Sequence, residues 1–254
     1  MERFYYQNPA NREDQNRRFF VILARPEKPE NVGLVARCMK NLGFENLRLV
    51  KQKGVEGGAL RTAIHARDIL EKANFYPDLT EAVSDLNLVF AATSKLRKNF
   101  SSLTFAEAIQ KIFDFPPSTK IGLLFGNERT GLTSEELKSS NFRFTIPQAT
   151  RQPSYNLAQA VLITLFQIFI NSSQGKEAGL EMPLPRWEQD ECLRLILEKL
   201  EKKKFIHKTN KAHVSEMIYD LFGRLVMTAR DRNLLLALFS KGIDEKRTTP
   251  SRKE

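Results

Sequence analysis

The chain has few of the residues that stabilise secreted proteins or bind metals. Its 254 residues include two cysteines, Cys38 and Cys192, and three histidines, His65, His207 and His213. The cysteines are far apart, and the histidines have no metal-ligand spacing with each other or with the cysteines, so we expect neither a disulfide framework nor a metal site. Low cysteine content is typical of proteins in a reducing compartment, and we expect a cytoplasmic location.

Long hydrophobic runs are also missing. The longest, VLITLFQIFI at residues 161–170, includes Gln167 and is much shorter than the roughly 20 residues of a membrane-spanning helix. Residues 1–18, MERFYYQNPANREDQNRR, contain no apolar core of a signal peptide. We therefore expect no membrane span, a buried helix at the apolar run, and a polar N-terminal arm at residues 1–18.

The charge is strongly of one sign. The 40 Lys and Arg residues outnumber the 30 Asp and Glu residues, which gives a formal net charge of +10. Such an excess favours a polyanionic partner, nucleic acid before a membrane surface, although a solvated basic surface is the alternative. One cationic cluster stands beside an aromatic residue and could grip nucleic-acid phosphates, or could be a solvated helix face: Lys202, Lys203, Lys204, Lys208 and Lys211.

Apolar runs and helical patterns alternate in the first two thirds of the chain. Short apolar runs, typical of buried parallel strands, occur at residues 19–24, 47–50, 86–93, 121–126 and 142–147. Helical spacing is predicted at residues 31–43, 63–73, 105–113, from 133 onward, and 156–171. Asn31 and Gly43 are the expected ends of the first helix. Thr133 and Glu136 are expected to form a capping box at the start of the helix from residue 133 onward. This alternation predicts an α/β domain with a mainly parallel sheet at residues 19–172.

The last third of the chain has a different pattern. Residues 173–183 are rich in small and polar residues and are expected to form a linker. We predict a small all-helical domain at residues 184–243 and a basic tail at residues 244–254. The expected helices carry apolar stripes that include Trp187, Leu193, Ile196, Leu200, Ile218, Leu221, Phe222, Leu225 and the run LLLALF at residues 234–239.

The loop GNERTGLT, residues 126–133, nearly matches the phosphate-binding pattern G-x-x-x-x-G-K-[ST]. Leu132 stands where the lysine of a P-loop would be, and Glu128 adds a negative charge, so both residues argue against an ATP-binding P-loop. Taken alone, the loop could be a tight turn whose glycines serve only the backbone geometry.

Two other segments change the interpretation of this loop. PENVGLVARCMKNLGF is similar to an N-x-x-x-x-x-R helix, LLFGNERTGLTSEEL to an FG-x-E-x-x-GL segment, and IPQATRQPSYNLAQAV to an IP…SLN-x-x-x-AV segment. With their order and spacing kept over residues 19–172, the three resemble the SPOUT (α/β-knot) RNA methyltransferases, in the SpoU/TrmH branch that methylates ribose 2′-hydroxyls. The C-terminal helices, including LFGRLVMTARDRN, resemble the extension of TrmJ-type tRNA methyltransferases more loosely.

This resemblance implies a sheet with a C-terminal trefoil knot, S-adenosylmethionine as cofactor, S-adenosylhomocysteine as product, and no metal. By motif match, the cofactor would be bound by Thr93, Ser94, Lys95, Gly126, Ile146, Pro153, Ser154 and Tyr155. These positions follow predicted strands, and open α/β sheets bind ligands at the carboxyl ends of their strands. Tyr155 departs from the leucine that is usual in the family.

The same match implies a catalytic set of Asn31, Arg37, Glu128, Ser154 and Asn156. The family account often makes Arg37 the base, but a guanidinium resists deprotonation, so we expect it to bind a phosphate and stabilise the developing alkoxide. Alternatively, Arg37 lays its stem over apolar surface. Asn31 could cap its helix or position substrate. Glu128 could orient Arg37 or the cofactor region, or bind the loop backbone. Ser154 and Asn156 could cap the last helix.

The sequence therefore favours an S-adenosylmethionine-dependent RNA 2′-O-methyltransferase. The resemblance suggests a homodimer that acts on the tRNA anticodon loop, at a cytidine or uridine at position 32, because a single-stranded loop exposes its 2′-hydroxyl. Ribosomal RNA and other tRNA positions remain open. A non-catalytic RNA-binding protein of the same fold is the other alternative, but it would not need Asn31, Arg37, Glu128 and Asn156 together.

Overall fold

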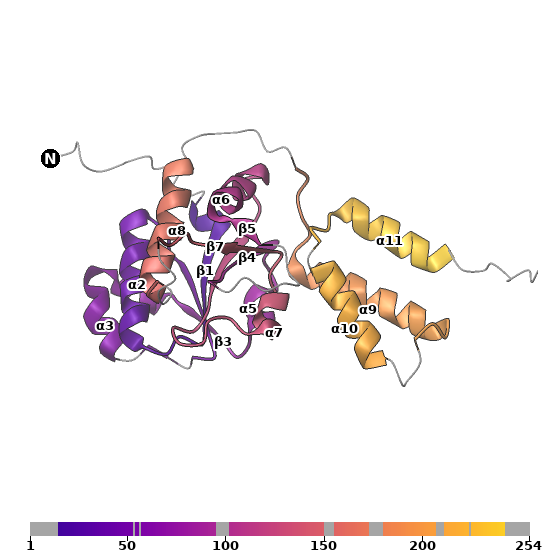
Figure 1. The fold of residues 1–254 in the computed structure, drawn as a ribbon, viewed down its shortest axis with the longest axis horizontal. Helices are drawn as coiled ribbons and strands as arrows, with labels where there is room; N and C mark the ends of the chain where they lie inside the picture. Colours follow the sequence, from indigo (N-terminus) through magenta and orange to yellow (C-terminus); the bar gives the residue numbers. More distant parts are fainter. Residues whose placement is uncertain are drawn as a thin grey trace, which may run out of the picture.

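The computed structural model describes residues 15–52, 54–55, 57–94, 102–149, 155–172, 180–206, 211–223 and 225–241. Two units lie side by side along the longest axis, an α/β domain and a group of three helices (Figure 1). Four residues predicted to bind the cofactor, RNA or substrate lie outside the described residues: Lys95, Pro153, Ser154 and Lys208.

In the described part of the chain, seven strands form one sheet in the order β3-β2-β1-β6-β4-β7-β5. They are β1 (Phe19–Ala24), β2 (Asn46–Val50), β3 (Asn74–Tyr76), β4 (Leu88–Ala92), β5 (Leu103–Thr104), β6 (Ile121–Phe125) and β7 (Phe142–Thr145). All six strand pairings are parallel, which confirms the predicted parallel sheet. The edge strands β3 and β5 are not predicted from the sequence, because three and two residues are too few to carry a pattern.

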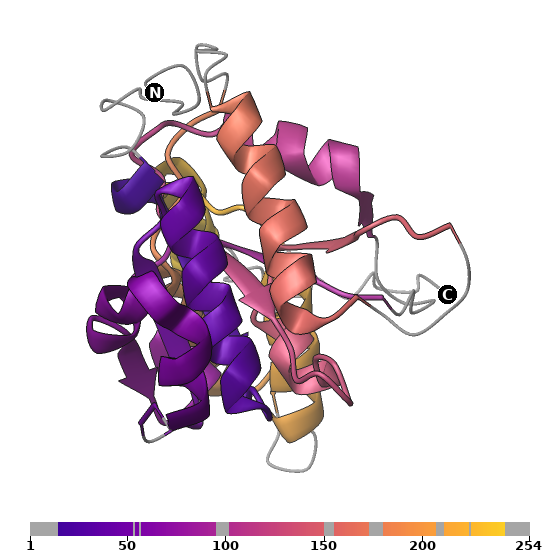
Figure 2. The same cartoon turned by 90° about the vertical axis from the view of Figure 1, so that its left-hand side faces the viewer.

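Helices cover both faces of the sheet. They are α2 (Pro29–Leu42), α3 (Gly57–Ala63), α4 (Arg67–Glu71), α5 (Leu79–Val83), α6 (Phe105–Asp114), α7 (Ser134–Lys138) and α8 (Leu157–Asn171). Side chains of β1 alternate: Val21 and Leu23 join the core under α2, α6 and α8, whereas Ile22 and Ala24 join the core with α5 and α7. Helices α2 and α8 lie side by side on the first face (Figure 2).

The ends of α2 correct one prediction and confirm another. The helix begins at Pro29 with Lys28 as its N-cap, because a proline in the first turn has no amide to leave unpaired. Asn31 is therefore not the cap; it lies inside the helix and is buried. The helix ends as predicted at Gly43, whose φ of 80° is left-handed. The range predicted as one helix, residues 63–73, instead holds the end of α3, a 3₁₀ turn at Ile64–Ala66, and α4.

The C-terminal helices α9 (Arg186–Lys202), α10 (Lys211–Gly223) and α11 (Ala229–Lys241) share a separate core that includes Ile196, Leu200 and Met227. Trp187, predicted in an apolar stripe, is 56% exposed because it lies at the start of α9, outside this core. None of the helices in the described part of the chain is long and apolar enough to cross a membrane.

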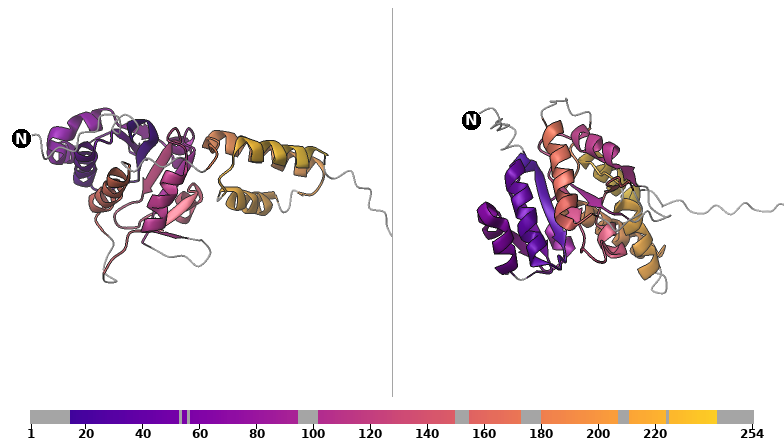
Figure 3. Two further views of the ribbon diagram at one scale, coloured as in Figure 1. Left: turned by 90° about the horizontal axis from the view of Figure 1, so that it is seen from above. Right: turned by 60° about the vertical axis from the view of Figure 1, so that its left-hand side comes forward.

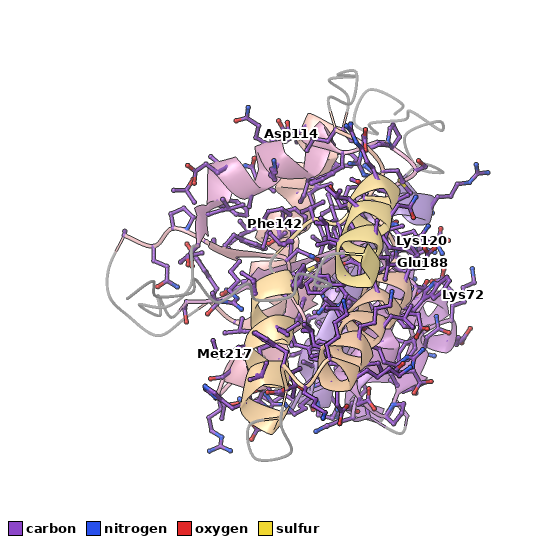
Figure 4. The ribbon with its side chains drawn as sticks, turned by 90° about the vertical axis from the view of Figure 1, so that its right-hand side faces the viewer. Lys72, Asp114, Lys120, Phe142, Glu188 and Met217 are labelled. Carbon is purple, nitrogen blue, oxygen red and sulfur yellow. The ribbon has the colours of Figure 1, made fainter. Side chains whose placement is uncertain are left out.

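The helical unit is attached at the amino ends of the sheet strands. The amide of Arg186 donates to the carbonyl of Leu86 at 2.8 Å, and Asn87 Nδ2, just before β4, donates to the carbonyl of Pro183 at 2.7 Å. From there the unit extends away from the α/β domain (Figure 3). Figure 4 looks onto its helices, with Glu188 on α9 and Met217 on α10.

Candidate active site

A pocket lies at the carboxyl ends of β4, β6 and β7. Its empty space is about 850 Å³ when the solvent-open mouth is counted. Five of the eight residues predicted to bind the cofactor line it: Thr93, Ser94, Gly126, Ile146 and Tyr155. The other three, Lys95, Pro153 and Ser154, lie outside the described residues.

The glycine loop, residues 126–131, forms one wall of this pocket. It folds back on itself, because the amide of Gly131 donates to the carbonyl of Asn127 at 2.8 Å and Gly131 has a left-handed φ of 68°. A Cβ on Gly126 would lie 2.4 Å from the backbone of Gly131 and Leu132. Both glycines are therefore required by geometry, and the wall exposes backbone to the pocket.

Leu132 decides against a P-loop. Its side chain is 6% exposed and packs in the core under α5 and α7. The structure thus places a core residue where a P-loop needs a phosphate-binding cation.

Three side chains from distant motifs form a hydrogen-bonded chain beside the pocket. Asn31 Nδ2 donates to Glu128 Oε1 at 2.8 Å, and Asn156 Nδ2 donates to Asn31 Oδ1 at 3.0 Å. Glu128 also lines the pocket and accepts from the amides of Glu27 (2.8 Å) and Lys28 (3.2 Å). Because an ionised carboxylate only accepts, Glu128 fixes the orientation of the Asn31 amide, which in turn fixes that of Asn156.

Asn156 caps α8 and also binds Asn31. Its Oδ1 accepts from the amide of Ala158 at 2.9 Å, in a capping box with Gln159 that begins α8. Its Nδ2 binds Asn31, as described above. The start of α8 is therefore attached directly to α2 at the pocket.

The environment keeps Glu128 ionised. Burial raises the pKa of its carboxyl, but hydrogen bonds from the Asn31 side chain and from the amides of Glu27 and Lys28 outweigh burial, so the pKa lies below its ordinary 4.5. Glu128 binds the backbone amides of the turn after β1 and the side chain of Asn31. Arg37 is not a partner in these bonds.

Tyr155 also closes a loop at the pocket. Its hydroxyl donates to the carbonyl of Pro147 at 3.0 Å, which joins the segment after β7 to the residue before the cap of α8. The ring lines the pocket and is 36% exposed.

Comparison with known proteins agrees with this geometry. Residues 18–166 match the SpoU rRNA Methylase family. The chain belongs to the SpoU methylase family. It is 36% identical over 217 residues to the tRNA (cytidine-2′-O-)-methyltransferase TrmJ of Methanocaldococcus jannaschii, covering 82% of this chain and 91% of that relative.

Two further relatives match along most of the chain. A tRNA (cytidine/uridine-2′-O-)-methyltransferase TrmJ of Pectobacterium atrosepticum is 28% identical, with 87% of this chain and 94% of the relative covered. The crystal structure of TrmJ from Z. mobilis ZM4 superposes with a TM-score of 0.74 at 27% identity, covering 87% of this chain and 97% of that chain. The similarity therefore extends beyond the SpoU methylase region into the C-terminal helices.

Not all residues singled out from the sequence meet in the pocket. Arg37 lies on α2 six residues beyond Asn31, is exposed, and is not among the residues that line the pocket. Lys202, Lys203 and Lys204 are exposed at the far end of α9, in the unit attached to the opposite end of the sheet. Lys211 begins α10, and its side chain is not described.

Arg25, which no sequence motif singled out, contacts the pocket wall. It lies directly after β1 and contacts the glycine loop and α7 through its guanidinium. Its place immediately after a buried strand, at the carboxyl end of the sheet, is the signal that could have identified it.

Proposed function

We propose that this SpoU methylase is an S-adenosylmethionine-dependent tRNA ribose 2′-O-methyltransferase. The observation that carries the proposal is that the pocket and the Glu128–Asn31–Asn156 chain lie side by side at the carboxyl end of the sheet. Methyl transfer needs its donor and its acceptor hydroxyl adjacent and aligned, and such a site provides a place for both. Two relatives that match most of this sequence are named tRNA 2′-O-methyltransferases.

The pocket residues fit S-adenosylmethionine. Gly126 lets a ligand approach the backbone closely, Ile146 and Leu157 offer apolar walls, and Thr93 and Ser94 offer polar groups. When bound, the cofactor supplies a methyl group on a positively charged sulfur. Knotting of the chain around this pocket, as the resemblance implies, is part of the proposal.

The protein residues divide the remaining work. Glu128 holds Asn31 and the turn after β1 in place, and Asn31 with Asn156 presents fixed polar groups next to the pocket. Transfer would form a bond between the ribose oxygen and the methyl carbon and break the sulfur–methyl bond, so that S-adenosylhomocysteine leaves and the hydroxyl proton passes to water. Negative charge would develop on the ribose oxygen as this proton leaves. Arg37 binds the phosphate beside this ribose and stabilises the charge.

A homodimer accounts for the outer position of Arg37. The apolar run of α8 is buried on one side only, because Leu162, Phe166 and Ile170 are 40%, 48% and 42% exposed while Val161, Leu165 and Ile168 are buried. Such a stripe on α8, next to α2, supports packing against a second copy. Arg37 does not line the pocket of its own chain. In that dimer, the partner's Arg37 can complete this pocket.

The proposed substrate is the tRNA anticodon loop, with a cytidine or uridine at position 32 as the target. An unpaired loop exposes its ribose hydroxyls, and the 2′-hydroxyl distinguishes RNA from DNA. The exposed lysines at the end of α9 would contact the phosphates of a substrate that extends well beyond the pocket. This substrate is also consistent with the cytoplasmic location expected from the sequence.

Methylation of unmodified tRNA tests the proposal. The protein is incubated with tRNA that lacks this modification and with S-adenosylmethionine labelled in its methyl group, and the product is mapped by nuclease digestion. The proposal predicts label in one 2′-O-methylnucleoside of the anticodon loop, and loss of label in Arg37→Ala and Arg37→Lys. Cofactor binding with no label in tRNA would contradict the proposed substrate. Near-normal turnover in Arg37→Lys would contradict the proposed role of Arg37.

A further inference from the structure

Arg25 connects two loops that meet at the pocket. Its guanidinium binds Glu136 with two hydrogen bonds, from Nε to Oε1 at 2.6 Å and from Nη2 to Oε2 at 2.8 Å. The same Nη2 donates to the carbonyl of Gly131 at 3.1 Å. The planar guanidinium suits such a fork, which a lysine ammonium cannot reproduce.

The backbone of Arg25 is fixed as firmly as its side chain. Its amide donates to the carbonyl of Val50 at 3.1 Å, and its carbonyl accepts from Asn127 Nδ2 at 2.9 Å. Its φ of 52° is left-handed, a conformation that is strained for a residue with a Cβ and persists where the surroundings impose it. The turn after β1 and the glycine loop therefore hold each other through both backbone and side chains.

The position of Gly131 gives these contacts a consequence for the pocket. Gly131 lies against Gly126, where a Cβ would be 2.4 Å from the Gly131 carbonyl carbon, and both glycines line the pocket. Because Arg25 holds the Gly131 carbonyl, it fixes how closely this part of the wall can approach a ligand. Glu136 is itself fixed, since its Oε2 accepts from the amide of Thr133 at 2.8 Å at the start of α7.

The same turn also reaches the hydrogen-bonded chain described above. The amides of Glu27 and Lys28, two and three residues after Arg25, donate to Glu128. Arg25 thus lies between the pocket wall on one side and the Glu128–Asn31–Asn156 chain on the other.

We propose that Arg25 is a positioning residue. It holds the glycine loop in the form that accepts the cofactor and keeps this loop aligned with the Glu128–Asn31–Asn156 chain. This role rests on the proposed methyltransferase function, because it assigns the pocket to S-adenosylmethionine. Arg25 acts through Gly131 and Glu136 and touches no reacting atom. Not every ion pair has this role: Lys40 and Asp68, 2.5 Å apart and more than a third exposed, join α2 to α4 away from the pocket.

Three variants separate positioning from simple stability. Arg25→Met removes both contacts, Arg25→Lys keeps the charge without the fork, and Glu136→Gln removes the ion pair while Arg25 can still reach Gly131. Lys40→Met is the matched control, since it removes an ion pair of α2 that lies away from the pocket. Binding of S-adenosylmethionine is measured by titration calorimetry, and amide exchange of residues 126–132 by mass spectrometry without cofactor.

Arg25→Met is expected to weaken cofactor binding about tenfold, the loss typical of one charge-assisted contact, and to speed exchange in residues 126–132. Arg25→Lys should fall between it and the wild type. Glu136→Gln should weaken binding less than Arg25→Met, because the Gly131 contact remains, and Lys40→Met should change neither readout.

The outcomes distinguish this proposal from the function on which it rests. Equal losses in Arg25→Met and Glu136→Gln would overturn the assigned contact with Gly131. Unchanged exchange and unchanged binding in Arg25→Met would overturn the positioning role, with the proposed function intact. A wild-type protein that binds no S-adenosylmethionine would overturn the proposed function and this role with it.

Discussion

The side-chain amide of Asn31 donates to the carboxylate of Glu128 at 2.8 Å, joining two residues that are 97 positions apart in the sequence. One belongs to a helix and the other to a loop, and they meet because both follow neighbouring strands, β1 and β6, of a parallel sheet. The amides of Glu27 and Lys28 bind the same carboxylate. This carboxylate therefore holds together the turn, the helix and the loop at the pocket.

Glu128→Gln should destabilise the protein and its site together. A glutamine offers one acceptor oxygen to three donors and places an NH₂ group against at least one of them, so we expect a loss of about 1–3 kcal/mol in the free energy of unfolding. Denaturant unfolding measures this loss. Glu27→Gln is the control, because the Glu27 carboxylate is half exposed and has only a 3.7 Å contact with Arg129. An equal loss in both variants would contradict the role of Glu128.

The loss in Glu128→Gln should also depend on pH. The pKa of Glu128 is lowered in the folded protein, so its stabilising effect is present above its ordinary 4.5 and is lost as the pH falls toward the lowered value. The difference in unfolding free energy from the wild type should be constant from pH 8 to about 5.5 and shrink below about 4.5. A difference that grew on acidification would show that the carboxylate is not held as described.

Gly126→Ala should distort the wall of the pocket. The added Cβ would lie 2.4 Å from the backbone of Gly131 and Leu132, which cannot rotate away as a side chain can. We expect at least tenfold weaker binding of S-adenosylmethionine, measured by calorimetry, since overpacking at such a site costs about 1–3 kcal/mol. Gly54→Ala is the control, because no described atom lies within 4 Å of the position of its Cβ. Normal binding by Gly126→Ala would contradict the assigned wall.

Apolar runs and glycines made much of this fold predictable. The five longer strands are continuous apolar segments between helical patterns, and the capping box of Thr133 and Glu136 is confirmed at α7. The cap assigned to Asn31 is wrong, because the helix starts two residues earlier at Pro29. The polar groups of Asn31 are used by Glu128 and Asn156, which are distant in sequence, and no local pattern reports such a contact.

Phe166→Asp should break the proposed dimer. The Phe166 side chain is 48% exposed in a stripe with Leu162 and Ile170, and a charge buried against a second copy would be strongly unfavourable. Light scattering after size-exclusion chromatography should show a dimer for the wild type and a monomer for the variant. The monomer should also lose methylation, since no partner would supply Arg37. The control is Lys72→Glu, an exposed change at the end of α4, and this variant should remain a dimer. A monomeric wild type would contradict the proposed dimer.

Residues of the site could be predicted from the sequence only where they belong to a motif. Five residues assigned to the pocket do line it, but the sequence did not show that Arg37 would lie outside the pocket of its own chain. The prediction of a buried helix at residues 161–170 holds for one face of α8 only, because an exposed apolar stripe looks like core in the sequence. Arg25 was missed because its partners, Gly131 and Glu136, are more than 100 positions away.

The lysines at the end of α9 should act on tRNA and not on the cofactor. Replacing Lys202, Lys203 and Lys204 together by glutamate should weaken tRNA binding and reduce its salt dependence, by up to about 0.9 in the log–log slope for each phosphate that is no longer neutralised. Binding of S-adenosylmethionine should be unchanged. Arg61→Glu, a 78% exposed position on α3, is the control. Equal effects of the triple variant and the control would favour a solvated helix face.

The most direct test of the account uses tRNA with a single 2′-deoxynucleotide at position 32. Methyl transfer from labelled S-adenosylmethionine is compared between this tRNA and the same tRNA with a ribonucleotide there. The account predicts label in the ribose-containing tRNA and none in the deoxy form, because the acceptor oxygen is missing. Equal labelling of both would show that the methyl group goes elsewhere and would contradict ribose methylation at this nucleotide.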